Sequence, residues 1–162
     1  MALVRLITHT PDPEKVIAVA ARLCYTKYSI DKVLKTMKHE EVKRSIEMLN
    51  EMKHESPIEH ASFTFGISGI SRACMAQMTR HRIASFSVKS QRYVNEDKFK
   101  YVTVPGMENN EMYKEVMENL HKAYKALKKE GFLNEDARFV LPNACDTQLI
   151  VTMNARSLKN FF

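Results

Sequence analysis

The sequence predicts a mixed α and β fold in one domain, on three observations. The chain has 162 residues, which is enough for one domain and too few for two of ordinary size. Short segments alternate apolar and polar residues, as strands do, and longer segments repeat apolar residues at helical spacing. Apolar residues make up 44% of the chain and charged residues 27%, the balance of an ordinary globular protein. We therefore expect residues 1–162 to form a single domain.

Strands are predicted where apolar residues alternate with small or polar ones. The clearest pattern is 61–68, where the odd positions are Ala, Phe, Phe and Ile and the even positions are Ser, Thr, Gly and Ser. One face of this strand is therefore expected to be buried. Weaker patterns predict strands over 3–8 and 148–153, and 88–93 is predicted to be an irregular strand or a loop.

Helices are predicted from apolar stripes and from residues that favour helix ends. Pro13 stands at a favourable first-turn position and opens a helix to about Cys24. In 39–53 the apolar residues at 42, 46, 49 and 52 form one stripe, and the other faces are mostly charged. The longest helix covers 109–129 and is closed by Gly131. Shorter helices are expected over 71–82, 134–139 and 155–162.

Charge and cysteine usage limit the class of protein. The net charge of +6 and the pI near 9.2 favour anionic partners, without choosing among nucleic acid, nucleotides and phosphorylated cofactors. No apolar run is long enough for a membrane span, and the N-terminus lacks the apolar core of a signal peptide, so we expect a cytoplasmic protein. Cys24, Cys74 and Cys145 stand far apart without a CxxC pair, which predicts reduced structural thiols and no metal site.

The most unusual segment is 80–93, RHRIASFSVKSQRY, which has four cationic side chains, four hydroxyls and no acid. Arginine presents a planar fork of donors that suits phosphate, and Gln77 lies one helical turn before Arg80. Cations together with hydroxyls and an amide are suited to a nucleotide. A solvated basic surface is the alternative, but the interleaved apolar residues at 83, 84, 86 and 88 suggest partial burial and hence an anionic ligand. No GxGxxG or GxxxxGK[ST] loop is present.

Two further clusters of polar residues are candidates for a site. HESPIEH brackets Pro57 just before the strong strand, and its spacing differs from the zinc motif HExxH. It is either a turn that aims His54 and Glu59 into a cleft or an ordinary turn at the start of a strand. The last stretch contains Arg138, Asn154, Arg156 and Asn160. Helix caps and polar side chains on the surface explain these residues as well as ligand binding does.

These segments together resemble a known family. The spacing from Arg80-His81-Arg82 to Ser90 is similar to the signature of the flavin-dependent thymidylate synthases, RHR, seven residues, then Ser. HESPIEHASFTF resembles that family's H-x-[ST]-P-x-E-H-x-x-F-T-F segment, and ARFVLP and VTMNARSLKNFF resemble its later motifs in the same order. The resemblance extends from about residue 21 to residue 162.

The resemblance implies an α+β fold, with a mostly antiparallel sheet flanked by long helices, and a homotetramer whose active sites form between subunits. It implies an enzyme that methylates dUMP at uracil C5 to give dTMP. Methylenetetrahydrofolate would supply the carbon, and FAD reduced by NADPH would supply the hydride, without nucleic-acid or membrane partners. The reduced flavin would make a protein nucleophile unnecessary, which agrees with three cysteines that lack an activating context.

The matched positions imply roles for individual residues. The catalytic set is His54, beside the folate ring, with Ser90 and Arg92, where Ser90 positions the substrate and is not a nucleophile. The residues expected to bind dUMP are Gln77, Ser90, Arg92 and Arg138. The residues expected to hold the flavin are Ser56, Glu59, Arg80, His81, Arg82, Ser87, Asn154, Arg156 and Asn160.

The chain also departs from the family pattern. Ser87 and Val88 stand where many members have Asn and Glu, so a carboxylate contact is lost or supplied elsewhere. The final apolar helical pattern stops at NFF without a cap, and the family continues with a helix that carries an Arg for uracil and a His for flavin. We therefore expect a C-terminally incomplete domain that binds FAD weakly and catalyses poorly by itself. A nucleotide- or RNA-binding module without catalysis is the alternative function.

Overall fold

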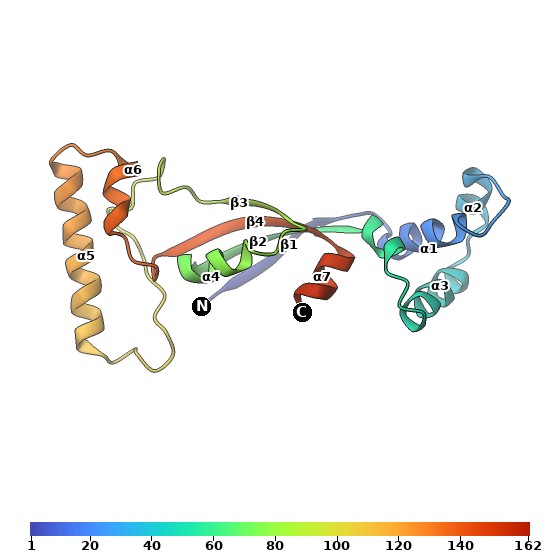
Figure 1. Ribbon diagram of the computed structural model, residues 1–162, viewed down its shortest axis with the longest axis horizontal. Helices are drawn as coiled ribbons and strands as arrows, with labels where there is room; N and C mark the ends of the chain where they lie inside the picture. The colour runs from blue at the N-terminus through green and yellow to red at the C-terminus, as the bar shows by residue number, and fades with distance from the viewer. The chain divides into compact units, whose positions relative to one another are not determined.

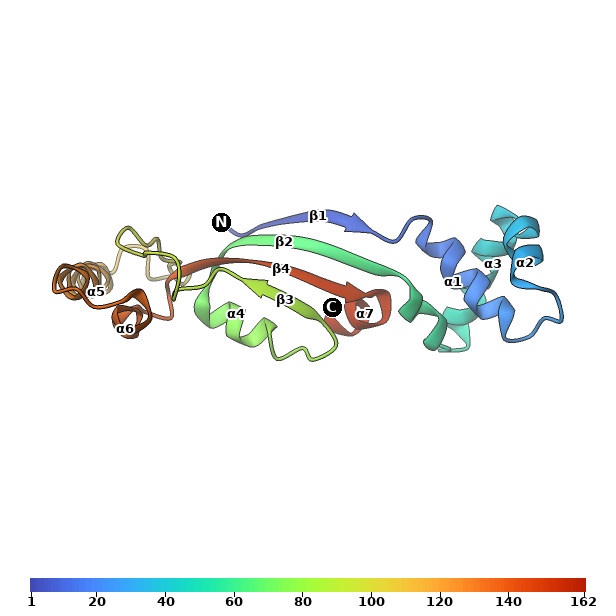
Figure 2. The ribbon, with the colours of Figure 1, turned by 90° about the horizontal axis from the view of Figure 1, so that it is seen from above.

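The computed structural model describes all 162 residues and confirms the α+β fold, with one antiparallel sheet of four strands. The strands are β1 (Leu3–His9), β2 (Ser62–Ser71), β3 (Ser85–Val88) and β4 (Asp146–Asn154). They lie in the order β1-β2-β4-β3, as Figure 2 shows. Directly after β1, the Thr10 N–H donates to the Ser62 carbonyl at the start of β2. Directly after β3, the Lys89 N–H donates to the Gln148 carbonyl near the start of β4. In both pairs the end of one strand lies beside the start of its neighbour, as in an antiparallel sheet.

Seven α-helices and two short 3₁₀-helices accompany the sheet. Four of the helices begin at a residue whose side chain accepts a backbone hydrogen bond, namely Ser29, Ser71, Asn110 and Asn154. The α-helices are α1 (Pro13–Leu23), α2 (Ile30–Thr36), α3 (His39–Glu51), α4 (Arg72–Met78), α5 (Glu111–Lys129), α6 (Asn134–Ala137) and α7 (Ala155–Phe161). The 3₁₀-helices are η1 (Ser56–His60) and η2 (Arg138–Val140), and Figure 1 labels the α-helices.

The residues fall into two compact units. The first contains residues 1–4, 66–82 and 86–150, and the second contains residues 5–65, 83–85 and 151–162. In the second unit α1 packs against α3 and η1 through a cluster formed by Ile17, Ala21, Leu49 and Ala61. A second cluster joins α1, α2 and α3, and it contains Ala18, Val33, Met37 and Val42. The apolar stripe predicted for 39–53 therefore faces the core at Val42 and Leu49, which are buried, whereas Met52 of the same stripe follows the end of α3 and is 64% exposed.

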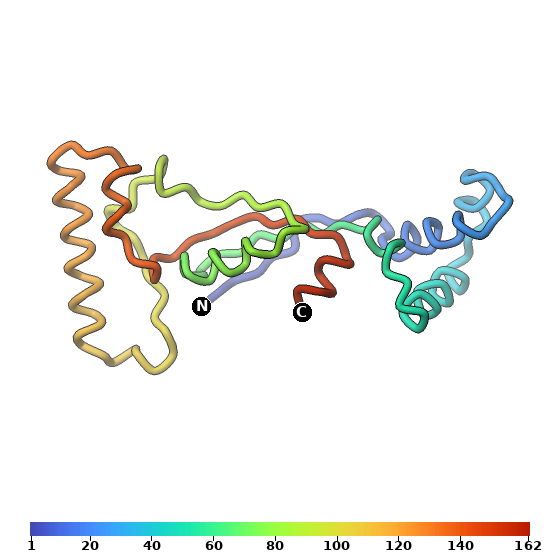
Figure 3. Tube along the Cα trace, viewed as in Figure 1, coloured from blue at the N-terminus to red at the C-terminus, as the bar shows by residue number.

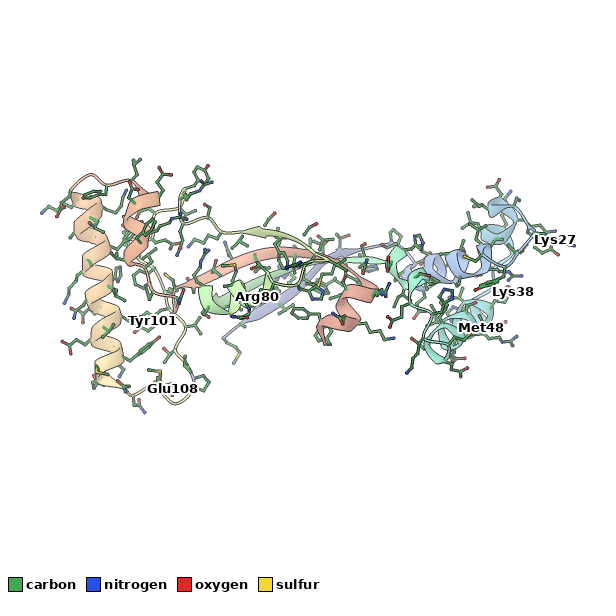
Figure 4. The ribbon with its side chains drawn as sticks, viewed as in Figure 1. Lys27, Lys38, Met48, Arg80, Tyr101 and Glu108 are labelled. Atoms are coloured by element: carbon green, nitrogen blue, oxygen red, sulfur yellow. The ribbon has the colours of Figure 1, made fainter.

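In the first unit a long connection packs on α5. Residues 89–110 run from β3 to α5 without a long helix or strand, and Figure 3 shows their path. Tyr124 of α5 is fully buried; its hydroxyl accepts the Glu96 N–H at 3.1 Å and donates to Asn95 Oδ1 at 3.3 Å. The ring of Tyr101, labelled in Figure 4, lies 5.9 Å from that of Tyr113 on α5. These contacts hold the connection that carries Ser90 and Arg92.

Several details differ from the sequence predictions. The helix expected over 71–82 ends at Met78, since the Thr79 N–H bonds back to the Gln77 and Met75 carbonyls and the chain then turns. The third strand is 85–88, earlier than the expected 88–93, and α2 was not predicted. β2 is half-buried along most of its length rather than on alternate residues only. No helix combines the length and the apolar character needed to cross a membrane.

Candidate functional site

The Arg80-His81-Arg82 triplet lies in a tight turn directly after α4. Ser71 begins this helix by accepting the Cys74 N–H at 3.1 Å. After Met78 the turn is closed because the Arg80 N–H donates to the Gln77 carbonyl at 3.1 Å. Arg80, labelled in Figure 4, and Arg82 are exposed, and so is Gln77 on the last turn of α4. The prediction that Gln77 and Arg80 lie one turn apart on the same helix was wrong, because α4 ends at Met78 and Arg80 follows in the turn.

The second part of the basic segment forms a turn after β3. The Val94 N–H donates to the Ser90 carbonyl at 3.0 Å, and the Arg92 N–H donates to Ser90 Oγ at 3.3 Å. Ser90 is half-buried, whereas Arg92 is exposed and its guanidinium lies 5.3 Å from the centre of the Tyr93 ring. Ser90 is thus held by its own turn, and Arg92 extends from the same turn toward solvent.

Lys89 has an acidic partner that lies outside the basic segment. Its Nζ lies 2.8 Å from Glu96 Oε1 and 2.9 Å from Oε2, and the hydrogen bond goes to Oε2. The side chain of Glu96 is only 4% exposed and that of Lys89 is 24% exposed. The Lys89 carbonyl also accepts a bond from Arg72 Nη1 at 3.4 Å. This cation therefore stabilises the local structure, and its charge is neutralised.

The three arginines of the segment differ from Lys89. Arg80, Arg82 and Arg92 are exposed and form no ion pair. Ala84, Phe86 and Val88 are half-buried as expected, but Ile83 is 70% exposed. The inference that apolar neighbours would bury the guanidinium groups was wrong, because the arginines are exposed although three of the four interleaved residues, Ala84, Phe86 and Val88, are half-buried. What remains is a set of three cations that no protein carboxylate neutralises.

In the second unit, η1 and α7 bring together residues that are far apart in the sequence. Arg156 Nη1 donates to Glu59 Oε1 at 2.5 Å, and Arg156 Nε lies 3.5 Å from Glu55 Oε2. Lys159 also approaches Glu55, at 3.2 Å. The hydrogen bond from Arg156 to Glu59 raises the pKa of the Arg156 guanidinium above its usual range. Two residues expected at the flavin therefore contact each other.

Two backbone features place these side chains. Asn154 caps α7 by accepting the Ser157 N–H at 2.8 Å, which confirms the predicted cap, and the Ala155 N–H donates to the Ala61 carbonyl. Pro57 is buried in η1, so the HESPIEH segment is a short turn directly before β2. Within it, Ser56 Oγ lies 3.1 Å from His54 Nε2. The predicted turn around Pro57 is confirmed.

The predicted site residues fall into two groups, one in each unit. The group in the first unit consists of Gln77, Arg80, His81, Arg82, Ser87, Ser90, Arg92 and Arg138. The group in the second unit consists of His54, Ser56, Glu59, Asn154, Arg156 and Asn160. Arg138 is half-buried and its Nε donates to the Glu135 carbonyl at 3.1 Å, while Ser87 and Asn160 are exposed. Both groups combine cations with hydroxyl or amide groups, which is the chemistry of a phosphorylated, hydrogen-bonding ligand.

Sequence reasoning missed a cleft between α1 and α3. It encloses about 650 Å³ and reaches from the end of α1 to His54. Its lining residues are Ala21, Arg22, Tyr25, Thr26, Glu41, Arg44, Ser45, Met48, Leu49, Met52 and His54. The sequence contains one signal for it, because Arg44 and Met48 of α3 and Met52, the residue that follows the helix, recur every four residues.

Comparison with known proteins gives consistent results at the levels of family, sequence and fold. Residues 5–162 match the family model described as "Thymidylate synthase complementing protein". The chain is 44% identical to the flavin-dependent thymidylate synthase of Clostridium tetani, over 98% of this chain and 72% of the relative. It is 48% identical to that of Geobacter sulfurreducens, over 98% of this chain and 71% of the relative.

The fold also matches solved structures. A crystal structure of Thymidylate Synthase X from Helicobacter pylori with FAD and dUMP superimposes with a TM-score of 0.78 at 26% identity. That match covers 99% of this chain and 81% of the other. A second structure of the Helicobacter pylori enzyme, also complexed with FAD and dUMP, gives a TM-score of 0.77 at 30% identity, over 98% of this chain and 81% of the other.

Proposed function

The chain belongs to the flavin-dependent thymidylate synthase family, and from this premise we propose that it catalyses the reductive methylation of dUMP to dTMP. FAD reduced by NADPH would supply the hydride, and methylenetetrahydrofolate the carbon. The observation that carries the proposal is the fold match over 99% of the chain to an enzyme with FAD and dUMP bound. We propose further that residues 1–162 belong to a single catalytic domain.

The charges of the first group suit two phosphorylated ligands. Arg80, Arg82 and Arg92 are exposed and lack carboxylate partners, so a bound phosphate would meet cations that are not already neutralised. In the proposal Arg80, His81, Arg82 and Ser87 hold FAD, while Arg92 and Arg138 hold the dUMP phosphate. When bound, the flavin supplies the hydride chemistry, and the protein supplies binding and orientation.

Ser90 is proposed to orient the uracil ring. Its oxygen accepts the Arg92 N–H, which leaves the hydroxyl proton available as a donor to a ligand. Arg92 would then favour the negative charge that develops on uracil oxygens as the ring gains electrons. Gln77 adds an amide that can both donate and accept. This arrangement needs no protein nucleophile.

The second group is proposed to complete flavin and folate binding. Ser56, Glu59, Asn154, Arg156 and Asn160 would contact the flavin, and His54 would lie by the folate ring. Glu59 and Arg156 are mutually neutralised, so they can offer hydrogen bonds to a ligand without adding net charge. His54 is oriented by Ser56 in the same turn.

Self-association and location complete the proposal. Leu3, Val4, Leu6 and Ile7 of the edge strand β1 are all exposed, and an apolar edge strand of this kind is normally covered by a partner. This supports the proposal of a homotetramer. We also propose that the protein acts in the cytoplasm, where reduced thiols such as Cys24, Cys74 and Cys145 persist.

Binding of added flavin tests the proposed function. With FAD supplied in excess, as the expected weak binding requires, the protein should bind the cofactor and show its flavin absorbance, with a maximum at roughly 450 nm. Addition of dUMP should change that spectrum, and Arg92→Ala should weaken the response. A colourless protein that binds RNA, with an affinity that falls steeply as salt increases, would instead favour the nucleic-acid alternative.

A further inference from the structure

The loop that carries Ser90 and Arg92 is closed at its base by a buried ion pair. This segment, residues 89–96 and here called the 89–96 loop, begins directly after β3 and ends beside α5. Lys89 and Glu96 stand at its two ends, and their charged groups lie 2.8 Å apart. Glu96 is buried, whereas residues 92–95 are exposed. Fixing the two ends of a loop removes many of the conformations that its backbone could otherwise adopt.

Each end of the loop is anchored to a different part of the first unit. The Lys89 N–H donates to the Gln148 carbonyl of β4 at 2.9 Å, and the Lys89 carbonyl accepts a bond from Arg72 of α4 at 3.4 Å. At the other end, the Glu96 N–H donates to the hydroxyl of Tyr124 on α5 at 3.1 Å. Figure 3 shows the backbone path from β3 through the loop to α5. The ion pair thus connects the sheet with α5 across the base of the loop.

Tyr124 supplies the hydrogen bond that fixes the α5 end of the loop. Its side chain is fully buried, and its hydroxyl also donates to Asn95 Oδ1 at 3.3 Å. The same Asn95 oxygen accepts the Asp97 N–H at 3.1 Å. Without the hydroxyl, the Glu96 N–H would lose its acceptor in a buried place, and the segment would have to move to regain one. The hydroxyl therefore fixes Glu96, and Glu96 in turn fixes the side chain of Lys89.

The middle of the loop is held less firmly than its ends. The Val94 N–H bonds to the Ser90 carbonyl and the Arg92 N–H to Ser90 Oγ, and both of these bonds lie inside the loop. Such bonds shape the turn but do not orient it relative to the rest of the unit. A bond from Asn134 Nδ2 to the Tyr93 carbonyl does reach another element, but it is long, at 3.5 Å. The orientation of the turn therefore depends mainly on how the two ends of the loop are held.

We propose that Tyr124, Glu96 and Lys89 are positioning residues, which set the affinity for dUMP by holding the 89–96 loop and do not contact the substrate. The inference rests on the proposed function, in which Ser90 and Arg92 bind dUMP. A loop that already has its binding conformation spares the ligand the cost of ordering it. If loss of the anchor reduces the binding-competent fraction of the protein to about one tenth, the apparent Kd for dUMP rises about tenfold.

Titration of dUMP into the purified protein with FAD in excess, followed by calorimetry, tests the proposal. Tyr124→Phe removes one oxygen atom and no charge, and it should raise the Kd for dUMP by about tenfold. Tyr113→Phe is the matched control, because it removes the same atom from the same helix but from a bond to the Val102 carbonyl, outside the loop. Its Kd for dUMP should equal that of the unchanged protein.

A separate titration of FAD distinguishes positioning from a general loss of structure. Arg80 and Arg82, which are proposed to hold FAD, precede the loop, so Tyr124→Phe should bind FAD as tightly as Tyr113→Phe does. A residue that only stabilised the fold would instead lower the fraction of folded protein, and with it the number of binding sites for both ligands. Positioning changes the Kd for dUMP alone and leaves the number of sites unchanged.

The direction of the effect of Glu96→Gln separates positioning from electrostatic attraction. The substitution removes a negative charge from the loop, so attraction alone predicts that the dUMP phosphate binds more tightly. Positioning predicts weaker binding, by about tenfold, because the Lys89 ammonium loses the carboxylate that holds it. Glu118→Gln removes an equal charge from an exposed pair on α5 and should leave the affinity for dUMP unchanged. If Glu96→Gln fails to fold, the comparison of Tyr124→Phe with its control still decides.

Three results would overturn the inference: equal affinity for dUMP in Tyr124→Phe and Tyr113→Phe, an equal loss of affinity for FAD in Tyr124→Phe, or tighter binding of dUMP by Glu96→Gln. If the unchanged protein binds FAD and dUMP while the two tyrosine variants bind dUMP equally, the positioning role falls and the proposed function stands. If the unchanged protein binds neither ligand, the proposed function falls and the positioning role falls with it.

Discussion

Glu96→Gln should destabilise the protein by an amount that follows from the burial of its ion pair. The substitution keeps the size of the side chain, so no cavity forms, but it leaves the Lys89 ammonium 2.8–2.9 Å from a neutral amide. Removing one partner of a buried pair typically costs about 3–5 kcal/mol. Because Lys89 is 24% exposed and part of its charge can reach water, we expect the free energy of unfolding to fall by about 2–3 kcal/mol.

Urea unfolding followed by circular dichroism measures this loss. With a slope of about 2 kcal/mol per molar urea, the midpoint should fall by about 1–1.5 M. The control is Glu118→Gln, which breaks an exposed pair with Lys122 at 3.3 Å on α5 and should cost less than about 0.5 kcal/mol. If Glu96→Gln and Glu118→Gln unfold at the same urea concentration, the assignment of Lys89 and Glu96 as a stabilising buried pair is refuted.

Two other predictions test the thiols and a helix cap. Burial raises the pKa of the Cys145 thiol from 9.0 to about 12, so Ellman's reagent should modify Cys24 and Cys74 quickly and Cys145 only after unfolding. Because the folded-state pKa is raised, the contribution of the protonated Cys145 thiol to stability is complete below pH 9 and is lost as the pH rises toward 12. The unfolding midpoints of the unchanged protein and of Cys145→Ser should therefore converge as the pH rises over this range. Asn154→Ala removes the cap of α7 and should lower the free energy of unfolding by about 1 kcal/mol, whereas Asn154→Asp should retain most of it; equal losses in both would contradict the capping role.

Local sequence signals predicted most of the elements. Pro13 marked the start of α1, the alternation at 61–68 located β2, and the apolar stripe identified α3. The short helix α2 was missed because seven residues give too little periodicity, and the end of α4 was missed because no Gly or Pro follows Met78. These failures concern short segments whose conformation depends on packing and capping.

The site was less predictable because its contacts are not local. Glu59 and Arg156 are far apart in the sequence, and only the pairing of β2 with β4 brings η1 beside α7. The partner of Lys89 is Glu96, and the turn that brings them together depends on Tyr124 of α5. The α1–α3 cleft likewise requires knowledge of which helices pack together. The motifs indicated the chemistry of the site, whereas its ion pairs and helix contacts could be identified only from the tertiary structure.

Titration of FAD against the purified protein and its Arg80→Ala variant, followed by flavin fluorescence, tests the central claim most directly. The unpaired arginines are proposed to hold the cofactor, so the unchanged protein should quench the fluorescence saturably and Arg80→Ala should lose at least about tenfold in affinity. Arg5→Ala removes an exposed arginine of β1 and should have no effect. Equal affinities for FAD in Arg80→Ala and the unchanged protein, or no quenching in either, would contradict the account.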